Sequence, residues 1–172
     1  DTITYTSDSF DLIAKYAIQM LTEGKAYMDD TPQELMREER EQRKNSVHRD
    51  ETPEVNLTRF KEMCTGSDAG KLWCLRAKAD MQSDNGCMRD FVCFRCPTVA
   101  VSHHRTGTKY KAYPTYDFAC PIVDSVEGVT HAMRTTEYND RLEQFHWVQE
   151  QLQLRKVTVQ EFARLGFEYT VM

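Results

Sequence analysis

The chain has 172 residues, of which 40% are hydrophobic and 28% charged, and its formal net charge at pH 7 is −5. This composition excludes a disordered chain, and the acidic balance argues against a protein whose only role is to clamp nucleic acid. No apolar run reaches the roughly 18 residues of a membrane-spanning helix, so we expect no membrane segment.

Residues 7–24 are predicted to form an amphipathic helix, which Gly24 can end. Five apolar residues fall on one face at helical spacing: Phe10, Ile13, Ala14, Ala17 and Leu21. The next segment, "KAYMDD" (25–30), partly alternates and is predicted to be a strand.

A second helix is predicted to begin at "TPQE", with Thr31 as its cap, Pro32 in the first position and Glu34 completing a capping box. Its body, "LMREEREQRKNSVHRD", is almost wholly charged, which is typical of a solvated arm or a partner surface. A third helix is predicted in "TPEVNLTRFKEMCTGSDAG".

A β-hairpin is predicted after this helical arm. "CLRAKAD" alternates apolar and charged residues, which predicts a half-buried strand with Arg76 facing solvent. "SDNG" supplies turn residues, and "CMRDFVCFRC" continues as a strand. The loop "SHHRTGTKYK" (102–111) is basic, and its residues alone leave open a phosphate contact or a solvated loop.

The last third alternates helices and strands. "YDFACPIVDSVEG" and "DRLEQFHWVQEQLQL" are predicted helices, while "VTHAMR" and "VTVQEFARLGFEYTVM" have strand character. Strands alternating with helices on both sides of an inserted arm and hairpin predict an α/β fold. We place the two halves of the main sheet at 1–30 and 111–172, and an inserted α+β subdomain at 31–110.

The six cysteines are expected to be free thiols in a reducing compartment, and no secretory signal is visible, so we predict a cytoplasmic protein. Cys93 and Cys96 of "CFRC" could join a zinc site, but strand alternation would place them on opposite faces. Cys120 and His131 could form a nucleophile and base, although no oxyanion motif accompanies them. We therefore predict no structural metal and no catalytic residue in this segment.

Arg134 comes at the end of the predicted strand "VTHAMR". In open α/β sheets ligands bind at the carboxyl ends of strands, and a guanidinium can hold a planar carboxylate through two parallel bonds. An ion pair with Asp140 or Glu137 at the surface is the other interpretation, and spacing alone does not separate them.

Several segments together resemble a known family. "AYPTYDFACPIVDSVEGVTHAMRTTEYNDR" is similar to the catalytic domain of glutamyl-tRNA synthetases of the archaeal and eukaryotic type. "YTSDSF", "EGKAYMDDTP", "MREEREQR", "CLRAKADM", "NGCMRD" and "HRTGTKY" agree in the same order, so the resemblance covers essentially the whole chain. The glutaminyl enzymes share most of this pattern.

The resemblance implies a class I aminoacyl-tRNA synthetase with a Rossmann-type parallel sheet, whose insert binds the tRNA acceptor end. It implies ATP-dependent activation of L-glutamate, with Mg²⁺ accompanying ATP, and transfer to the acceptor end of tRNA-Glu. The HIGH motif would precede Asp1 and the KMSKS-type loop would follow Met172, so we expect the segment to be inactive alone. Partners in a multi-synthetase complex would bind through other regions.

The resemblance also implies roles for single residues. The family's pattern assigns glutamate binding to four positions: Tyr116, Asp117, Cys120 and Arg134. It assigns ATP contacts to four others: Thr135, Glu137, Arg164 and Leu165. Contacts with tRNA are implied for Asp140 and Arg105; a helix cap at Asp140 is equally compatible with its sequence context.

Arg134 favours a glutamyl over a glutaminyl enzyme, because glutaminyl enzymes typically carry a cysteine there. Neutral glutamine would leave the guanidinium buried and unpaired, at a cost of roughly 3–5 kcal/mol. A glutaminyl enzyme and a non-catalytic, synthetase-derived binding module remain the alternatives. Two departures from the family pattern are Phe91, where "MRDP" is usual, and Gly166, where "RLN" is usual.

Overall fold

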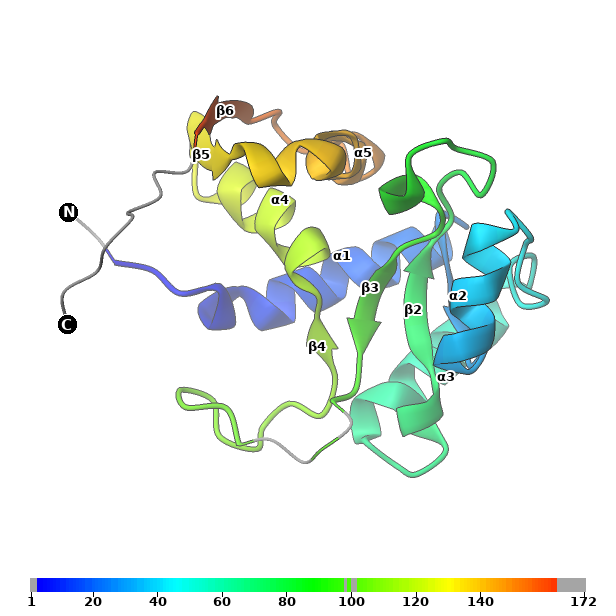
Figure 1. The fold of residues 1–172 in the computed structure, drawn as a ribbon. Helices are drawn as coiled ribbons and strands as arrows, with labels where there is room; N and C mark the ends of the chain where they lie inside the picture. The colour runs from blue at the N-terminus through cyan, green and yellow to red at the C-terminus, as the bar shows by residue number, and fades with distance from the viewer. Residues whose placement is uncertain (1–2, 98, 100–101, 164–172) are drawn as a thin grey trace, which may run out of the picture.

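The computed structural model describes residues 3–97, 99 and 102–163. These residues form two sheets, an antiparallel one in the order β1-β2-β3-β4 and a parallel pair, β5-β6 (Figure 1). The strands of the antiparallel sheet are β1 Ala26–Asp29, β2 Cys74–Ala77, β3 Val92–Arg95 and β4 Tyr113–Pro114. The parallel strands are β5 His131–Thr135 and β6 Thr158–Phe162.

In the described part of the chain, five α-helices surround these sheets. They are α1 Phe10–Thr22, α2 Gln33–Glu41, α3 Pro53–Thr65, α4 Tyr116–Val126 and α5 Leu142–Gln151. Short 3-10 turns are η1 Thr6–Ser9, η2 Gly70–Leu72, η3 Gly86–Met88 and η4 Thr136–Arg141. Among the described residues, no helix combines the length and the apolar character needed to cross a bilayer.

The main core lies where α1, α3 and α4 pack against the antiparallel sheet. The stripe predicted for the first helix is confirmed at Phe10, Ile13, Ala17 and Leu21, which are buried in this core. A smaller cluster around Phe145 lies between α5 and the parallel strands. Burial of these apolar side chains is the main favourable contribution to folding.

The predicted α/β class is confirmed. α5 connects β5 to its parallel neighbour β6, which is the βαβ arrangement expected for the main sheet. In Figure 1 this unit lies with α4 above the antiparallel sheet.

The antiparallel sheet draws its strands from all three predicted segments. β1 belongs to the segment 1–30, β2 and β3 to 31–110, and β4 to 111–172. The chain boundaries at residues 30 and 110 therefore run through a continuous sheet, and an inserted subdomain at 31–110 stays a prediction.

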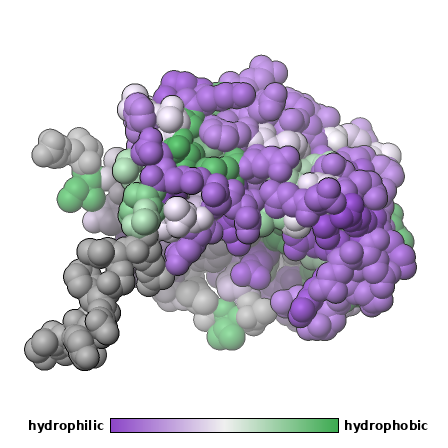
Figure 2. Space-filling view, turned by 45° about the horizontal axis from the view of Figure 1, so that its top comes forward, coloured by the Kyte–Doolittle hydropathy of each residue, from purple (hydrophilic) through white to green (hydrophobic). Residues whose placement is uncertain are grey.

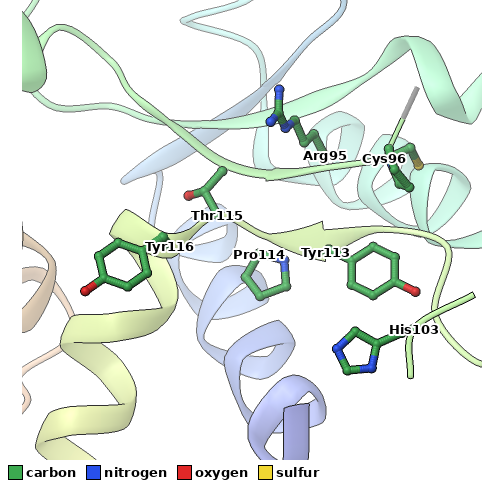
Figure 3. A pocket seen from close by; sticks show the side chains of 8 residues that line it. Arg95, Cys96, His103, Tyr113, Pro114, Thr115 and Tyr116 are labelled. Carbon is green, nitrogen blue, oxygen red and sulfur yellow. The ribbon is translucent and has the colours of Figure 1, made fainter. Parts of the chain in front are cut away.

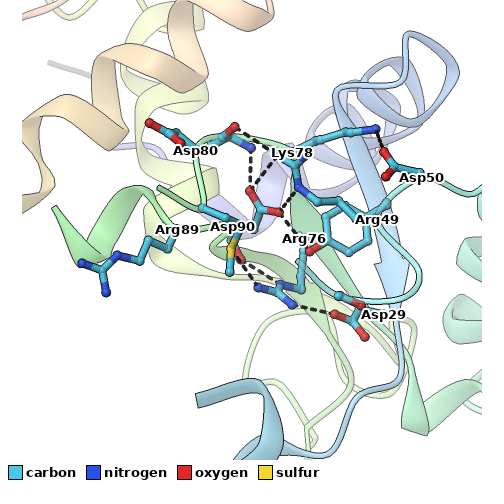
Figure 4. A network of polar contacts seen from close by, with 12 residues as sticks. Asp29, Arg49, Asp50, Arg76, Lys78, Asp80, Arg89 and Asp90 are labelled. Carbon is cyan, nitrogen blue, oxygen red and sulfur yellow. Dashed lines mark hydrogen bonds and ion pairs between the residues drawn. The ribbon is translucent and has the colours of Figure 1, made fainter. Parts of the chain in front are cut away.

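The prediction that β2 is half-buried is wrong. Arg76 is fully enclosed, because β2 is paired on both sides and both of its faces are covered. Arg76 Nη1 donates to Asp29 Oδ2 at 2.6 Å and Nε donates to the Asp90 carbonyl at 2.8 Å (Figure 4). Arg49 Nε also donates to the Asp90 carboxylate, at 2.7 Å. Pairing with these acceptors offsets the desolvation of the buried charges.

The second helix is shorter than predicted and begins differently. Pro32 is its N-cap, while the Thr31 amide donates to Asp29 Oδ1, so the predicted Thr31 cap is wrong. The helix ends at Glu41, and none of its residues is buried, in agreement with the predicted solvated arm. The face of the molecule that Figure 2 shows is mainly hydrophilic, with small apolar patches.

Candidate functional site: a guanidinium between α4 and β5

Three side chains of α4 form a row that faces β5. Tyr116, Cys120 and Asp124 are spaced at i, i+4 and i+8, so they lie above one another on the same side of the helix. The chain enters α4 through Thr115, whose hydroxyl donates to the Val92 carbonyl of β3 at 2.8 Å. This bond ties the start of the row to the antiparallel sheet.

Arg134, on β5, extends its guanidinium to this row. Its Nη2 lies 2.6 Å from Cys120 Sγ and 2.9 Å from Asp124 Oδ2, and its Nη1 lies 3.3 Å from the Met133 carbonyl. The Tyr138 ring centroid is 5.6 Å from the guanidinium carbon. The Arg134 Nε is shielded from solvent and has no hydrogen-bond partner. The donor that stays exposed and only weakly held is therefore Nη1, whose contact is a backbone carbonyl.

The protonation states of the row follow from burial. Burial raises the pKa of the Cys120 thiol to about 11. Tyr116 is 60% exposed, and desolvation of its covered part together with the contact to Cys120 raises the pKa of its phenol to about 12. Burial lowers the pKa of Arg134, but the surrounding Cys120, Tyr116 and Asp124 outweigh it and hold the pKa above its usual value. The thiol and phenol are thus neutral at pH 7, and the guanidinium is charged.

Two hollows meet at Tyr116. One, of about 370 Å³, is lined by Cys120 and Asp124 together with Tyr5, Ser7 and Arg105. The other, of about 570 Å³, lies between the end of β3, with Arg95 and Cys96, and the segment Tyr113–Tyr116 (Figure 3). His103 borders both hollows. The site is therefore an open, partly aromatic groove beside a fixed positive charge.

The other sequence-predicted glutamate-site residue, Asp117, lies next to this row and not in it. Its carboxylate pairs with Arg141, at the end of η4, and its Oδ1 is buried without a partner. Asp117 lines neither hollow, in contrast to Tyr116 and Cys120, which the fold brings together with Arg134.

Thr135 is the last residue of β5, and Glu137 is the second residue of η4. The Thr135 hydroxyl donates to Glu137 Oε2 at 3.3 Å. The structure thus places both of these predicted ATP contacts at the end of β5. Arg164 and Leu165, the other two predicted ATP contacts, lie outside the described residues.

The two predicted tRNA contacts lie apart from each other. Asp140 is exposed, and its carbonyl accepts a bond of 2.9 Å from Asn85 Nδ2, so the loop before η3 meets η4 there. Arg105 pairs with Asp8 at 2.8 Å, and its guanidinium carbon lies 3.7 Å from the centroid of Tyr5. A phosphate at Arg105 would have to compete with the Asp8 carboxylate.

Asp124 is the residue that sequence reasoning missed. The sequence offers Asp140 and Glu137 as surface partners of Arg134, whereas the structure pairs Arg134 with Asp124. Neutral glutamine would therefore not leave the guanidinium wholly unpaired, because the Asp124 carboxylate already contacts it. The spacing of four residues from Cys120 to Asp124 was a signal that could have revealed it.

The alternative chemistries considered from the sequence are not assembled. Among the described residues, the group of three possible metal ligands is Asp29, Asp30 and His48, so the cysteines of "CFRC" form no such group with His103. Asp29 already pairs with Arg76. Cys120 contacts Arg134, whereas His131 is exposed and bonds to Thr130, so the described residues do not pair this thiol with His131 as its base.

Comparison with known proteins decides the family. The model of class I tRNA synthetases (E and Q), catalytic domain, matches residues 1–172. The chain belongs to this family. The sequence-based recognition of a glutamyl/glutaminyl-type class I synthetase is confirmed, and with it the Rossmann-type class I catalytic fold.

Relatives of this synthetase segment share about half of its residues or more. It is 58% identical over all 172 residues to the bifunctional glutamate/proline–tRNA ligase of Cricetulus griseus, of which it covers 11%. It is 52% identical to the probable cytoplasmic glutamate–tRNA ligase of Schizosaccharomyces pombe, covering 24% of that protein. It is 50% identical to the cytoplasmic glutamate–tRNA ligase of Saccharomyces cerevisiae, again covering 24%. The segment thus spans about a tenth to a quarter of the length of these relatives.

Proposed function

We propose that this synthetase segment is the central part of the catalytic domain of a cytoplasmic glutamate–tRNA ligase. The whole-chain similarity to ligases named for glutamate supports the substrate. The observation that carries the proposal is the Arg134 guanidinium, which lies against Cys120 and Asp124 in the wall of the smaller hollow and whose Nη1 reaches only a backbone carbonyl. Such a group recognises a planar carboxylate through charge and paired hydrogen bonds.

The reaction has two steps. The α-carboxylate of glutamate attacks the α-phosphorus of ATP, the bond to the β-phosphate oxygen breaks, and pyrophosphate leaves. A ribose hydroxyl of the terminal adenosine of tRNA-Glu then attacks the carbonyl carbon, loses its proton, and AMP leaves. Mg²⁺ accompanies ATP and screens its phosphate charges. Catalysis of this kind depends on positioning and charge stabilisation.

We assign the residues of this chain to binding and orientation. Arg134 takes the γ-carboxylate, with Tyr116 and Cys120 forming the wall beside it and Asp117 supporting η4 through Arg141. Thr135 and Glu137, together with Arg164 and Leu165, are assigned to ATP.

The acceptor end of tRNA is assigned to the second hollow and to Asp140. Tyr113, Tyr116 and His103 give the hollow aromatic edges on which a base can stack, and Arg95 adds positive charge (Figure 3). Asp140 is exposed where the loop of Asn85 meets η4, and Arg105 is assigned to the backbone phosphates.

The substrate assignment is tested with the full-length protein that contains this chain. Activation of glutamate and of glutamine is compared by ATP–pyrophosphate exchange, in the parent and in the Arg134→Cys variant. We expect the parent to prefer glutamate and the variant to lose about a decade or more of that preference, the equivalent of roughly 1.5 kcal/mol for one charged hydrogen bond. Preference for glutamine in the parent would instead favour a glutaminyl enzyme. If the parent showed no exchange with either amino acid, a binding module would be favoured. Preserved glutamate preference in the variant would remove Arg134 from the role.

A further inference from the structure

We propose that Asp124 is the positioning residue of the amino-acid site: it holds the Arg134 guanidinium in the orientation that receives the substrate γ-carboxylate. This inference rests on the proposed function and extends it, since no resemblance or comparison assigns a role to Asp124. It follows from the contacts that Asp124 makes and from those that it leaves open.

Asp124 occupies one nitrogen of the guanidinium. Asp124 Oδ2 accepts a hydrogen bond from Arg134 Nη2 at 2.9 Å. The side chains are largely buried, since that of Arg134 is 20% exposed and that of Asp124 19%. An arginine side chain has many rotamers, so an unpaired guanidinium at the end of β5 would sample several positions. One charged hydrogen bond from a rigid helix restricts it to one of them.

Asp124 also leaves the rest of the guanidinium available. Nε has no partner, and Nη1 reaches only a backbone carbonyl at 3.3 Å. The second contact of Nη2 is the Cys120 thiol, which is a weak acceptor that a carboxylate oxygen can displace. The arrangement thus combines one strong internal acceptor, Asp124, with an exposed and weakly held Nη1 that can turn to the substrate, whereas Nε is enclosed.

The Cys120 thiol contacts both members of the pair formed by Asp124 and Arg134. Its Sγ lies 3.5 Å from Asp124 Oδ2 and 2.6 Å from Arg134 Nη2. Asp124 and Cys120 both line the smaller hollow, so the carboxylate that holds the guanidinium lies at the wall of the proposed glutamate site. A second carboxylate, that of glutamate, would then meet a guanidinium whose direction is already set.

The test compares Asp124→Ala, Asp124→Asn and Arg134→Ala in the full-length enzyme, by ATP–pyrophosphate exchange. Asp124→Ala removes the acceptor, and we expect its KM for glutamate to rise about tenfold or more, the equivalent of one missing charged hydrogen bond. The kcat and the KM for ATP should stay within about twofold, because a positioning residue acts on glutamate binding. Asp124→Asn keeps an acceptor oxygen and should lie between the parent and Asp124→Ala.

Three results would overturn the inference. An unchanged KM for glutamate in Asp124→Ala would show that Arg134 needs no support. A lowered KM would show that Asp124 competes with the substrate for the guanidinium. Equal increases in the KM for glutamate and for ATP, accompanied by a lower melting temperature, would indicate a structural role alone.

Arg134→Ala separates this inference from the proposed function. If Arg134→Ala raises the KM for glutamate and Asp124→Ala does not, only the role of Asp124 fails. If Arg134→Ala leaves the KM for glutamate unchanged, the proposed glutamate site itself is wrong.

Discussion

Arg76 shows how a single residue can contradict its local pattern. Its neighbours on β2 alternate in the manner of a half-exposed strand, yet its side chain is completely buried. Asp29 Oδ2 and the Asp90 carbonyl satisfy two of its donors, and its guanidinium carbon lies 5.5 Å from the Tyr27 ring centroid. Buried charges of this kind persist only when their partners are in place.

Replacing Arg76 therefore tests the network. Arg76→Met should lower the free energy of unfolding by about 3–5 kcal/mol, because it leaves the Asp29 carboxylate buried without its cation. The measurement is urea unfolding of the parent and the variant. Combining the change with Asp29→Asn removes both charges, so the double variant should lose less than the sum of the two single losses. Strict additivity would mean that the two side chains are not coupled.

His48 is a second residue whose charge state matters. Its Nε2 lies 2.8 Å from Asp30 Oδ1 and its Nδ1 lies 2.8 Å from Glu51 Oε1, while Arg59 also pairs with Glu51. Burial lowers the pKa of His48, but the bonds to Glu51 and Asp30 outweigh it, so the pKa is raised. The imidazolium therefore connects the end of β1 to the loop before α3.

The raised pKa of His48 predicts stability that depends on pH. The contribution is complete below the unfolded pKa of about 6.5 and is lost as the pH rises through the higher folded pKa. The free energy of unfolding should therefore fall above about pH 6.5, in part through this residue. His48→Gln should cost about 1 kcal/mol at pH 6 and less at pH 9. A loss that is the same at both pH values would contradict the charged pair.

At the scale of elements, a left-handed glycine comes after α1 and another after α3, but their surroundings differ. Gly24 follows α1 with φ 67° and Gly66 follows α3 with φ 70°, both in the left-handed region that favours glycine. A Cβ at Gly24 would meet nothing within 4 Å, whereas one at Gly66 would lie 2.7 Å from Lys111 Cβ. The end of α3 is therefore packed against the segment that leads to β4.

Alanine at these two glycines separates backbone strain from packing. Gly24→Ala should cost about 1 kcal/mol, the strain of a left-handed residue with a Cβ. Gly66→Ala should cost more, because the same strain is joined by overlap with Lys111. Urea unfolding of both variants gives the comparison. Equal losses would mean that the segment around Lys111 moves aside without cost.

At the scale of the whole molecule, buried polar contacts join the parallel unit to the rest. Gln149 of α5 is fully buried, where its Nε2 donates to the Pro121 carbonyl at 3.1 Å and its Oε1 accepts from the Val157 amide at 3.2 Å. One side chain thus connects α4, α5 and the entry to β6. Lys25 Nζ adds a bond of 2.7 Å to the Gln151 carbonyl.

Gln149→Leu should loosen this junction. It leaves a carbonyl and an amide buried without partners, which should cost about 2–4 kcal/mol of unfolding free energy. Hydrogen exchange should accelerate most at the β5 and β6 amides and less in β1–β3, because the lost bonds anchor the parallel unit. Glu150→Leu, at the exposed neighbouring position, is the control and should change stability by only about 0.5 kcal/mol. Uniform acceleration in both sheets would contradict a local role.

The sequence by itself determined most helices and strands, because periodicity, glycine stops and turn residues are local signals. It also determined the family, because the family's motifs stand in order along the chain. Tertiary structure decided the rest. Arg76 is buried because β2 is a central strand and both of its faces are covered, and Arg134 meets Asp124 because α4 lies beside β5. Contacts between residues distant in sequence depend on how elements pack, which no local pattern contains.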